Sequence, residues 1–294
     1  MRLWPFQQKQ PQPQDRTGLQ RVGLILIPLS LVGLLALLPM IGRLWPDSHD
    51  GKHHPLTSPA ACPSCPVATT TLPSPTPSLP LPSVLGFPLF SGNPDLPEIA
   101  LTFDDGPNPV STPQILILLQ RSGISATFYV IGAQAQAYPA LVKQELQLGH
   151  MVGNHTWTHP PLTSLSSNAV YNELQSTSQA IQAATGSSPI VFRPPYGQYN
   201  SSVQGVAARL GLSTVLWSID SKDWSKPGTS AIIESILSTT HNGSIILLHD
   251  GGGDRSQTVA ALPTILTTLT QRGFQFVTVA RLMHDLPHGG TRPT

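Results

Sequence analysis

Two adjacent carboxylates, Asp104 and Asp105, come directly after the apolar run at residues 99–103 and directly before a Gly-Pro pair. Neighbouring residues of a strand point to opposite faces, so both carboxylates can reach one site only where the strand ends and the backbone turns. The competing interpretation is an ordinary surface turn, in which Asp, Gly and Pro are common. Polar clusters farther along the chain favour a shared site with acid–base or metal chemistry.

His155 and His159 stand four residues apart in the sequence His-Thr-Trp-Thr-His. On a helical turn or in a tight loop, this spacing brings both imidazoles to one side, which suits a metal ion. With one carboxylate of the aspartate pair they would form a set of three ligands, which leaves positions open for water or substrate. The second aspartate would then be free to take a proton from water. Two exposed or core histidines that bind nothing are the alternative.

Arg193, Asp223 and His249 belong to three further polar clusters. Arg193 precedes two prolines that fix the backbone, and its guanidinium would keep a nearby carboxylate ionised and oriented, although a purely structural ion pair is also open. His249 suits a general acid if Asp223 orients its ring and raises its pKa. Trp224 follows Asp223 and is either a core residue or a wall on which a sugar ring stacks.

These clusters require strands that all end at one edge of a sheet. Seven apolar runs alternate with segments that carry helix punctuation, which predicts a parallel sheet, open or closed into a barrel. Ligands of such folds bind at the carboxyl ends of the strands, so the polar clusters should converge. The predicted strands are residues 99–103, 126–131, 151–154, 190–192, 214–219, 244–248 and 275–279. The predicted helices are residues 112–123, 139–149, 168–185, 201–210 and 256–272, the last with a kink or restart at Pro263.

Residues 22–42 contain no ionisable side chain. As a helix that rises about 1.5 Å per residue, this segment can cross a hydrocarbon core of roughly 30 Å. Basic residues precede it, which predicts a cytoplasmic N-terminus at residues 1–21, an uncleaved transmembrane signal anchor and a single-pass protein of the cell membrane. A cleaved secretory signal peptide is the competing interpretation, but the run is long for one and no small-x-small cleavage site follows it.

Residues 43–94 are rich in Pro, Ser and Thr and predict a semi-extended linker that leads to an extracytoplasmic domain at residues 95–286 and a tail at residues 287–294. Cys62 and Cys65 lie in this linker, where they form a local or intermolecular disulfide or have no function. The chain has 16 Lys and Arg residues against 15 Asp and Glu residues. This balance does not suggest a nucleic-acid partner, and we interpret the protein as a monomer.

Five sequence blocks together resemble the motifs of a known enzyme family. The blocks are TFDDGP (102–107), HTWTH (155–159), RPPYG (193–197), DSKDW (220–224) and LLHD (247–250). In this order they are similar to the five motifs of the polysaccharide deacetylases of the NodB-homology type, carbohydrate esterase family 4. The resemblance covers roughly residues 97–285, and no position expected to do chemistry departs from it.

The resemblance implies a distorted (β/α) barrel that binds one divalent metal ion, zinc first and cobalt as the alternative. It implies hydrolysis of the N-acetyl amide of N-acetylglucosamine-type residues in a cell-wall or extracellular polysaccharide. The implied metal ligands are Asp105, His155 and His159. Peptidoglycan, a chitin-like oligomer and an exported polymer all remain open as substrates.

The resemblance also implies a role for each remaining site residue. Asp104 would be the base, held by Arg193, and His249 the acid, held by Asp223. The residues implied to meet the substrate are Tyr196, through its backbone N–H at the oxyanion, and Trp224 and Leu247, around the acetyl methyl group.

Two other functions remain open for the same residues. An O-acetyl esterase acting on an acetylated glycan would use the same metal and base, but its alkoxide leaving group makes different demands on His249. A catalytically silent, membrane-tethered glycan-binding module is the second alternative. The presence of Asp104 and His249 argues against it, because binding alone needs neither a base nor an acid.

Overall fold

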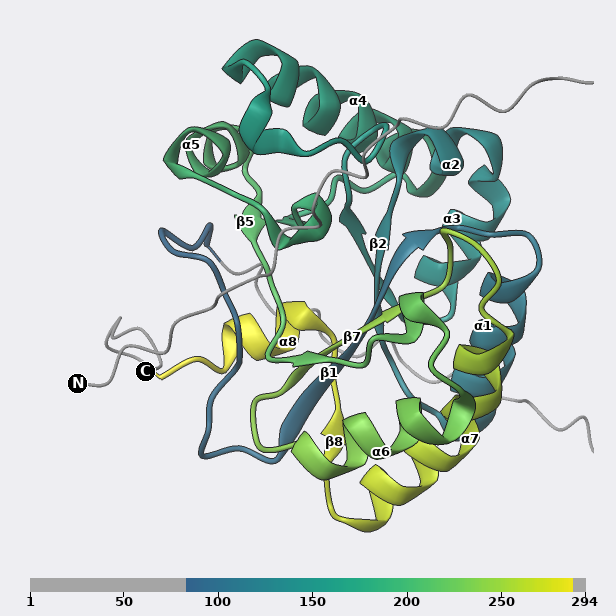
Figure 1. Cartoon of the computed structure of the whole chain (residues 1–294). Helices are drawn as coiled ribbons and strands as arrows, with labels where there is room; N and C mark the ends of the chain where they lie inside the picture. The colour runs from purple at the N-terminus through teal and green to yellow at the C-terminus, as the bar shows by residue number, and fades with distance from the viewer. Residues whose placement is uncertain (1–82, 288–294) are drawn as a thin grey trace, which may run out of the picture. The chain divides into compact units, whose positions relative to one another are not determined.

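The structure is a computed structural model that describes residues 83–287 (Figure 1). Outside the described residues lie the predicted cytoplasmic N-terminus at residues 1–21, the predicted anchor at residues 22–42, most of the predicted linker with Cys62 and Cys65, and nearly all of the predicted tail. Within residues 83–287, no helix is both long and apolar enough to cross a bilayer. The anchor and the single-pass topology therefore stay predictions.

The described residues form an α/β fold around one curled, parallel sheet, which confirms the predicted fold class at that level. Seven strands lie on one path in the order β5-β4-β3-β2-β1-β7-β6, and β8 pairs with the beginning of β1. The strands are β1 (Glu98–Gly106), β2 (Thr127–Val130), β3 (Met151–Asn154), β4 (Val191–Phe192), β5 (Ser213–Thr214), β6 (Ile219–Asp220), β7 (Ile245–His249) and β8 (Gln275–Phe276). The central strand β1 is buried along almost its whole length, as expected of a strand covered on both faces.

The single strand predicted at residues 214–219 is wrong. The structure divides this run into β5 and β6, which lie at opposite edges of the sheet. Between them, the Leu216 N–H donates to the carbonyl oxygen of Leu89 at 2.7 Å rather than to a neighbouring long strand. A continuous apolar run shows that a segment is buried, but its periodicity does not show that the chain crosses from one sheet edge to the other.

Residues 89–92 bridge part of the gap between the two edges of the sheet. The Leu89 N–H donates to the carbonyl oxygen of Thr214 at 2.9 Å, beside β5. The Gly92 N–H donates to the carbonyl oxygen of Gly243 at 2.7 Å, just before β7. The sheet is therefore a curled half-barrel whose opening is spanned by irregular backbone instead of a regular strand.

Eight α-helices and three short 3₁₀ turns connect the strands within residues 83–287. The helices are α1 (Ser111–Ser122), α2 (Gly132–Ala137), α3 (Pro139–Gln147), α4 (Ser167–Thr185), α5 (Ser201–Arg209), α6 (Thr229–Thr239), α7 (Ser256–Gln271) and α8 (Val279–His284). The predicted helices are confirmed as α1, α3, α4, α5 and α7, and Pro263 lies inside α7 without dividing it. Helices α2, α6 and α8 were not predicted.

The main apolar core lies between the sheet and the helices that cover its outer face, α1, α6 and α7 among them (Figure 1). Alternate residues of β1, such as Leu101 and Phe103, pack there against helix residues such as Ile115 and Leu262. A second cluster fills the inner side of the curl and includes Leu89, Ala100, Tyr129, Ile245 and Met283. Packing on both faces fixes the strands, so their carboxyl ends provide a rigid platform for a site.

Candidate active site

The aspartate pair lies inside β1, because the strand continues to Gly106. A register shift interrupts the pairing with β2 between Asp104 and Gly106, and Asp105 adopts the left-handed backbone conformation with φ 73°. Both carboxylates consequently reach His155, whose Nε2 lies 3.7 Å from Asp104 Oδ2 and 3.5 Å from Asp105 Oδ1. The shared site is present as predicted, but a bulge within the strand creates it, and the expected turn after the strand does not.

The two histidines lie in the loop after β3 and face the same carboxylate. His159 Nε2 is 3.3 Å from Asp105 Oδ1, and ligand atoms of Asp105, His155 and His159 all lie within 4.8 Å of one another. His159 has a left-handed backbone with φ 60°, so a tight loop brings the two rings together. The structure thus groups the three predicted ligands.

The surroundings of these groups fit a divalent cation. Asp105 Oδ1 is buried and has no hydrogen-bond partner among the described residues. His155 Nδ1 lies 2.8 Å from the carbonyl oxygen of Arg193, which makes Nδ1 the donor and turns Nε2 toward Asp104 and Asp105. An unpaired carboxylate oxygen that faces two imidazole nitrogens is a donor set that zinc prefers.

The pKa directions agree with a site that attracts positive charge. Burial would raise the pKa of Asp105, but the interaction with His155, whose Nε2 lies 3.5 Å from Oδ1, holds it below its ordinary value, so this carboxylate is ionised. Burial lowers the pKa of His155, yet the charges of Asp104 and Asp105 raise it above its ordinary value. The carboxylates that favour a proton on His155 would equally favour a cation beside it. Burial and the charge of His155 lower the pKa of His159, which keeps its ring neutral.

Arg193 follows β4 and orients Asp104. Its guanidinium is completely buried, and Nη1 donates to Asp104 Oδ1 at 2.7 Å and to Thr102 Oγ1 at 2.7 Å. Nη2 donates to the carbonyl oxygen of Leu216 at 2.9 Å, and the guanidinium carbon lies 4.1 Å from the centre of the Tyr129 ring. With this many fixed partners, the arginine holds one face of the Asp104 carboxylate and leaves the other toward His155.

His249 ends β7 and is held by Asp223. The imidazole Nδ1 lies 2.7 Å from Asp223 Oδ1, and the His249 backbone N–H donates to Asp223 Oδ2 at 2.9 Å. Burial alone would lower the pKa of His249, but the hydrogen bond and charge of Asp223 outweigh it and raise that pKa above its ordinary value. In the sheet register, His249 is the β7 partner of Asp104, so the acid and base candidates lie on adjacent strands.

The three remaining predicted residues lie around this centre. Tyr196 has a left-handed backbone with φ 59°, and its ring meets the ring of His159 edge-on at 4.7 Å between centroids. Trp224 is exposed beside Asp223, which rules out the core interpretation. Leu247 is buried and shares the inner face of β7 with His249, since alternate residues of a strand point the same way.

Several residues that hold the site were not predicted. Thr258 of α7 donates its hydroxyl proton to Asp223 Oδ2 at 2.8 Å, and Thr112 of α1 donates to Asp250 Oδ2 at 2.5 Å. Burial is the main reason that the pKa of Asp250 rises to about 7. Asp250 was visible in the sequence as the last letter of a motif block, whereas single threonines in helices carry no spacing signal.

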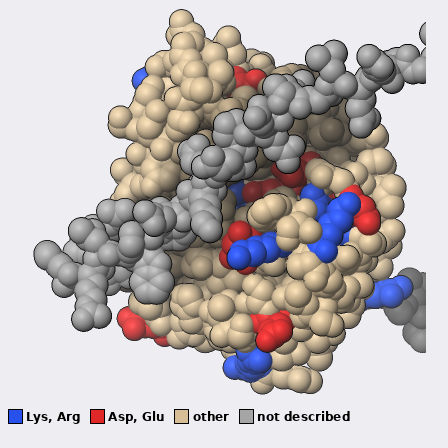
Figure 2. All heavy atoms as spheres, in the orientation of Figure 1, with Lys and Arg blue, Asp and Glu red and all other residues tan. Residues whose placement is uncertain are grey.

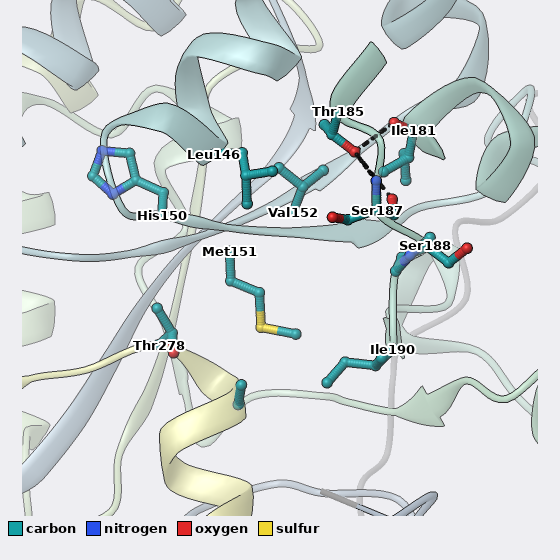
Figure 3. Close-up of a pocket in the computed structure, with 12 residues that line it drawn as sticks. Leu146, His150, Met151, Val152, Ile181, Thr185, Ser187, Ser188, Ile190 and Thr278 are labelled. Carbon is teal, nitrogen blue, oxygen red and sulfur yellow. Dashed lines mark hydrogen bonds between the residues drawn. The ribbon is translucent and has the colours of Figure 1, made fainter. Parts of the chain in front are cut away.

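The surface of the described residues carries few charges (Figure 2), and one of its cavities lies apart from the candidate site. Figure 2 shows a largely uncharged face on which acidic and basic side chains gather around a hollow. A separate cavity of about 330 Å³ lies at the amino ends of the strands, among side chains such as Met151, Val152 and Ile190. Figure 3 shows the His150 ring pointing away from Met151 and Ile190, so this cavity lacks convergent acid–base groups.

A family model and several known proteins match this chain in sequence. The family model described as polysaccharide deacetylase matches residues 91–215, which include the first three motif blocks. A peptidoglycan-N-acetylglucosamine deacetylase of Bacillus cereus is 44% identical over 187 residues, which are 63% of this chain and 87% of that protein. A chitooligosaccharide deacetylase of Sinorhizobium fredii is 42% identical over 189 residues, which are 60% of this chain and 88% of that protein.

A solved structure is also similar to the structure of this chain. The structure of the Bc1960 peptidoglycan N-acetylglucosamine deacetylase matches with a TM-score of 0.65 and 33% sequence identity, and the match covers 68% of this chain and 94% of that chain. The relatives have high sequence identity to this chain over most of their length, and the fold and the five motif blocks lead to the same family. The chain therefore belongs to the polysaccharide deacetylase family, carbohydrate esterase family 4.

Proposed function

We propose that this chain hydrolyses the N-acetyl groups of N-acetylglucosamine residues in peptidoglycan and releases acetate. The Bacillus cereus relative is named as a peptidoglycan-N-acetylglucosamine deacetylase, which supports the substrate. One observation carries the chemistry: the ligand atoms of Asp105, His155 and His159, all within 4.8 Å of one another, adjoin an Asp104 bonded to Arg193. An acid–base pair beside a metal-ligand set is the arrangement that metal-assisted amide hydrolysis requires.

The group held by Asp105, His155 and His159 is, in this proposal, a zinc ion, with cobalt as the alternative. When bound, it would polarise the acetyl carbonyl and lower the pKa of water as a Lewis acid. The unpaired Asp105 Oδ1 and the His155 Nε2 that faces it support this assignment.

Asp104 is proposed as the general base. Arg193 Nη1 holds Asp104 Oδ1 at 2.7 Å, which fixes the orientation of the carboxylate. Asp104 Oδ2 faces His155 and the ligand set, so it is directed at the region where the attacking water would be. It takes one proton from that water as the oxygen–carbon bond forms.

His249 is proposed as the general acid. An amide nitrogen is a poor leaving group until it is protonated, so the carbon–nitrogen bond breaks as His249 transfers its proton to the amine. Asp223, fixed by His249 and by Thr258, holds the ring and favours its protonated form. The products are acetate and a free amino sugar, and the protons taken by Asp104 and given by His249 balance.

The substrate is proposed to meet Tyr196, Trp224 and Leu247. The Tyr196 backbone N–H would donate to the oxyanion, and Leu247 and Trp224 would receive the acetyl methyl group. The exposure of Trp224, 54%, supports contact with a sugar ring rather than with the core.

Acetate release from a panel of glycans tests this function. The purified full-length protein is incubated with peptidoglycan, N-acetylglucosamine oligomers and an O-acetylated xylan, and acetate is measured. We expect release from peptidoglycan first and from the oligomers second. Release from xylan alone would favour the O-acetyl esterase, and release from no glycan would contradict the proposed function.

We also propose that residues 22–42 anchor the protein in the cell membrane, with the site outside the cytoplasm. The basic residues before this uncharged segment support the orientation. Membrane fractionation tests it: the full chain should sediment with membranes, and a chain without residues 1–82 should not. Equal sedimentation of both would contradict the anchor.

A further inference from the structure

The loop that connects β7 to α7 contains three consecutive glycines, Gly251, Gly252 and Gly253, followed by Asp254 and Arg255. Arg255 is buried and folds back over the first two glycines. Its Nε donates to the carbonyl oxygen of Gly251 at 2.6 Å, and its Nη2 donates to that of Gly252 at 3.0 Å. The guanidinium thus fixes two successive peptide groups of this loop.

The same two glycines lie in close contact with Asp104 and Asp105. The Gly251 N–H donates to the carbonyl oxygen of Asp104 at 3.2 Å. A side chain on Gly251 would overlap the backbone oxygen of Asp105, and one on Gly252 would overlap the Asp105 carboxylate at Oδ2. Asp105 has φ 73°, a strained conformation for a residue other than glycine. Such a conformation persists only where the surrounding structure holds it, and the glycine loop is in contact with it.

We propose that Arg255 is a positioning residue that fixes the Asp105 carboxylate for metal binding through Gly251 and Gly252. The inference rests on the ligand role that the proposed function gives to Asp105. Arginine suits the task because its planar fork can donate to two carbonyl oxygens at once, which a lysine ammonium on a flexible stem does less rigidly.

The burial of Arg255 supports a role beyond stability. Its Nη1 is buried and has no hydrogen-bond partner among residues 83–287. Burial of a charged group with an unsatisfied donor costs free energy, so folding stability alone gives little reason for this side chain. The other two nitrogens bond to the two glycines that contact Asp105.

The test measures zinc affinity in the full-length protein after its metal has been stripped, by competition with a chromogenic chelator. Arg255→Met should weaken zinc binding by about 10–100-fold, the usual effect of removing a group that orients a metal ligand. Arg255→Lys should fall between wild type and Arg255→Met. The matched control is Arg272→Met, at the other end of α7, where the arginine is exposed and bonds to the carbonyl oxygen of Leu237.

A second pair of variants keeps the test decisive if Arg255→Met does not fold. Gly252 and Gly253 both have positive φ, 71° and 135°, but an added methyl group overlaps Asp105 only at Gly252. Gly252→Ala should therefore weaken zinc binding, and Gly253→Ala should weaken it much less, although a φ of 135° strains an alanine more than a φ of 71° does. Equal zinc affinity in wild type, Arg255→Met and Gly252→Ala would overturn the inference, even if the melting temperatures fell.

A further variant separates this inference from the proposed function. If Asp105→Ala retains wild-type zinc affinity, the proposed metal site itself is wrong. If Asp105→Ala loses zinc while the Arg255 and Gly252 variants keep it, only the positioning role fails.

Discussion

Neighbouring aspartates take different roles in this account because their partners differ. Asp104 accepts a hydrogen bond from Arg193, whereas Asp105 Oδ1 is buried without a partner and faces His155 and His159. A carboxylate bonded to a buried guanidinium is held in one orientation, as a base should be, while an unpaired oxygen among imidazoles is available to a cation. The sequence alone places both residues in one block and does not show which does what.

Asp104→Asn separates the two roles. The amide keeps the shape and most hydrogen bonding of the carboxylate but cannot accept the proton, so kcat should fall by at least about 10²–10⁴-fold. KM should change little and zinc content should stay near wild type, because the loss belongs to the transition state. Zinc content and turnover are measured on the same preparations, with Asp105→Asn as the comparison. If Asp104→Asn loses zinc and Asp105→Asn keeps it, the roles are reversed.

The pH dependence of kcat tests the acid. His249 must be protonated to donate, so activity should fall as pH rises through its pKa, which Asp223 holds above the ordinary value. Asp223→Asn removes the charge that favours the imidazolium, so the alkaline limb should move to lower pH. Asp220→Asn is the control, because Asp220, at the end of β6 and three residues before Asp223, accepts a hydrogen bond from the backbone N–H of Lys222. An alkaline limb that stays in place in Asp223→Asn would exclude His249 as the group that titrates there.

At the scale of elements, the alternation of apolar runs and helix punctuation predicted most strands and the positions of the site residues at their ends. It could not predict the bulge at Asp105, because that bulge depends on the distant loop after β7. The Asp250 and Gly251 N–H groups both donate to the carbonyl oxygen of Asp104, at 3.0 and 3.2 Å. Thr258 escaped prediction for the same reason, since its partner Asp223 is 35 residues away in the sequence. Arg255 bonds to nearby glycines, but these glycines contact Asp105 only in the folded chain.

Leu89 tests the importance of the segment that spans the open edge of the sheet. It is 1% exposed, and its backbone bonds to Thr214 and Leu216. Leu89→Ala should destabilise the fold by about 2–5 kcal/mol through the cavity it leaves. Denaturant unfolding measures the loss, and Phe90→Ala, at a side chain that is 40% exposed, is the control. If both substitutions lower the free energy of unfolding by similarly small amounts, the segment contributes little to the stability of the fold.

At the scale of the whole molecule, the family is established by its relatives, its fold and the convergence of five motif blocks. The sequence predicted the parallel α/β architecture because burial patterns and helix caps are local. It did not predict how the curled sheet is spanned by residues 89–92, since that depends on contacts between distant segments. The anchor and linker remain predictions from composition, and with them the proposal that the enzyme acts on a glycan outside the cytoplasm.

Acetate release from N-acetylglucosamine oligomers, measured before chelation, after chelation and after zinc is returned, tests the central claim most directly. A metal-dependent deacetylase should lose activity on chelation and recover it with zinc. Asp105→Ala should fail to recover under the same conditions, because its metal site lacks the carboxylate. Full activity in a preparation shown to be free of metal would contradict the account.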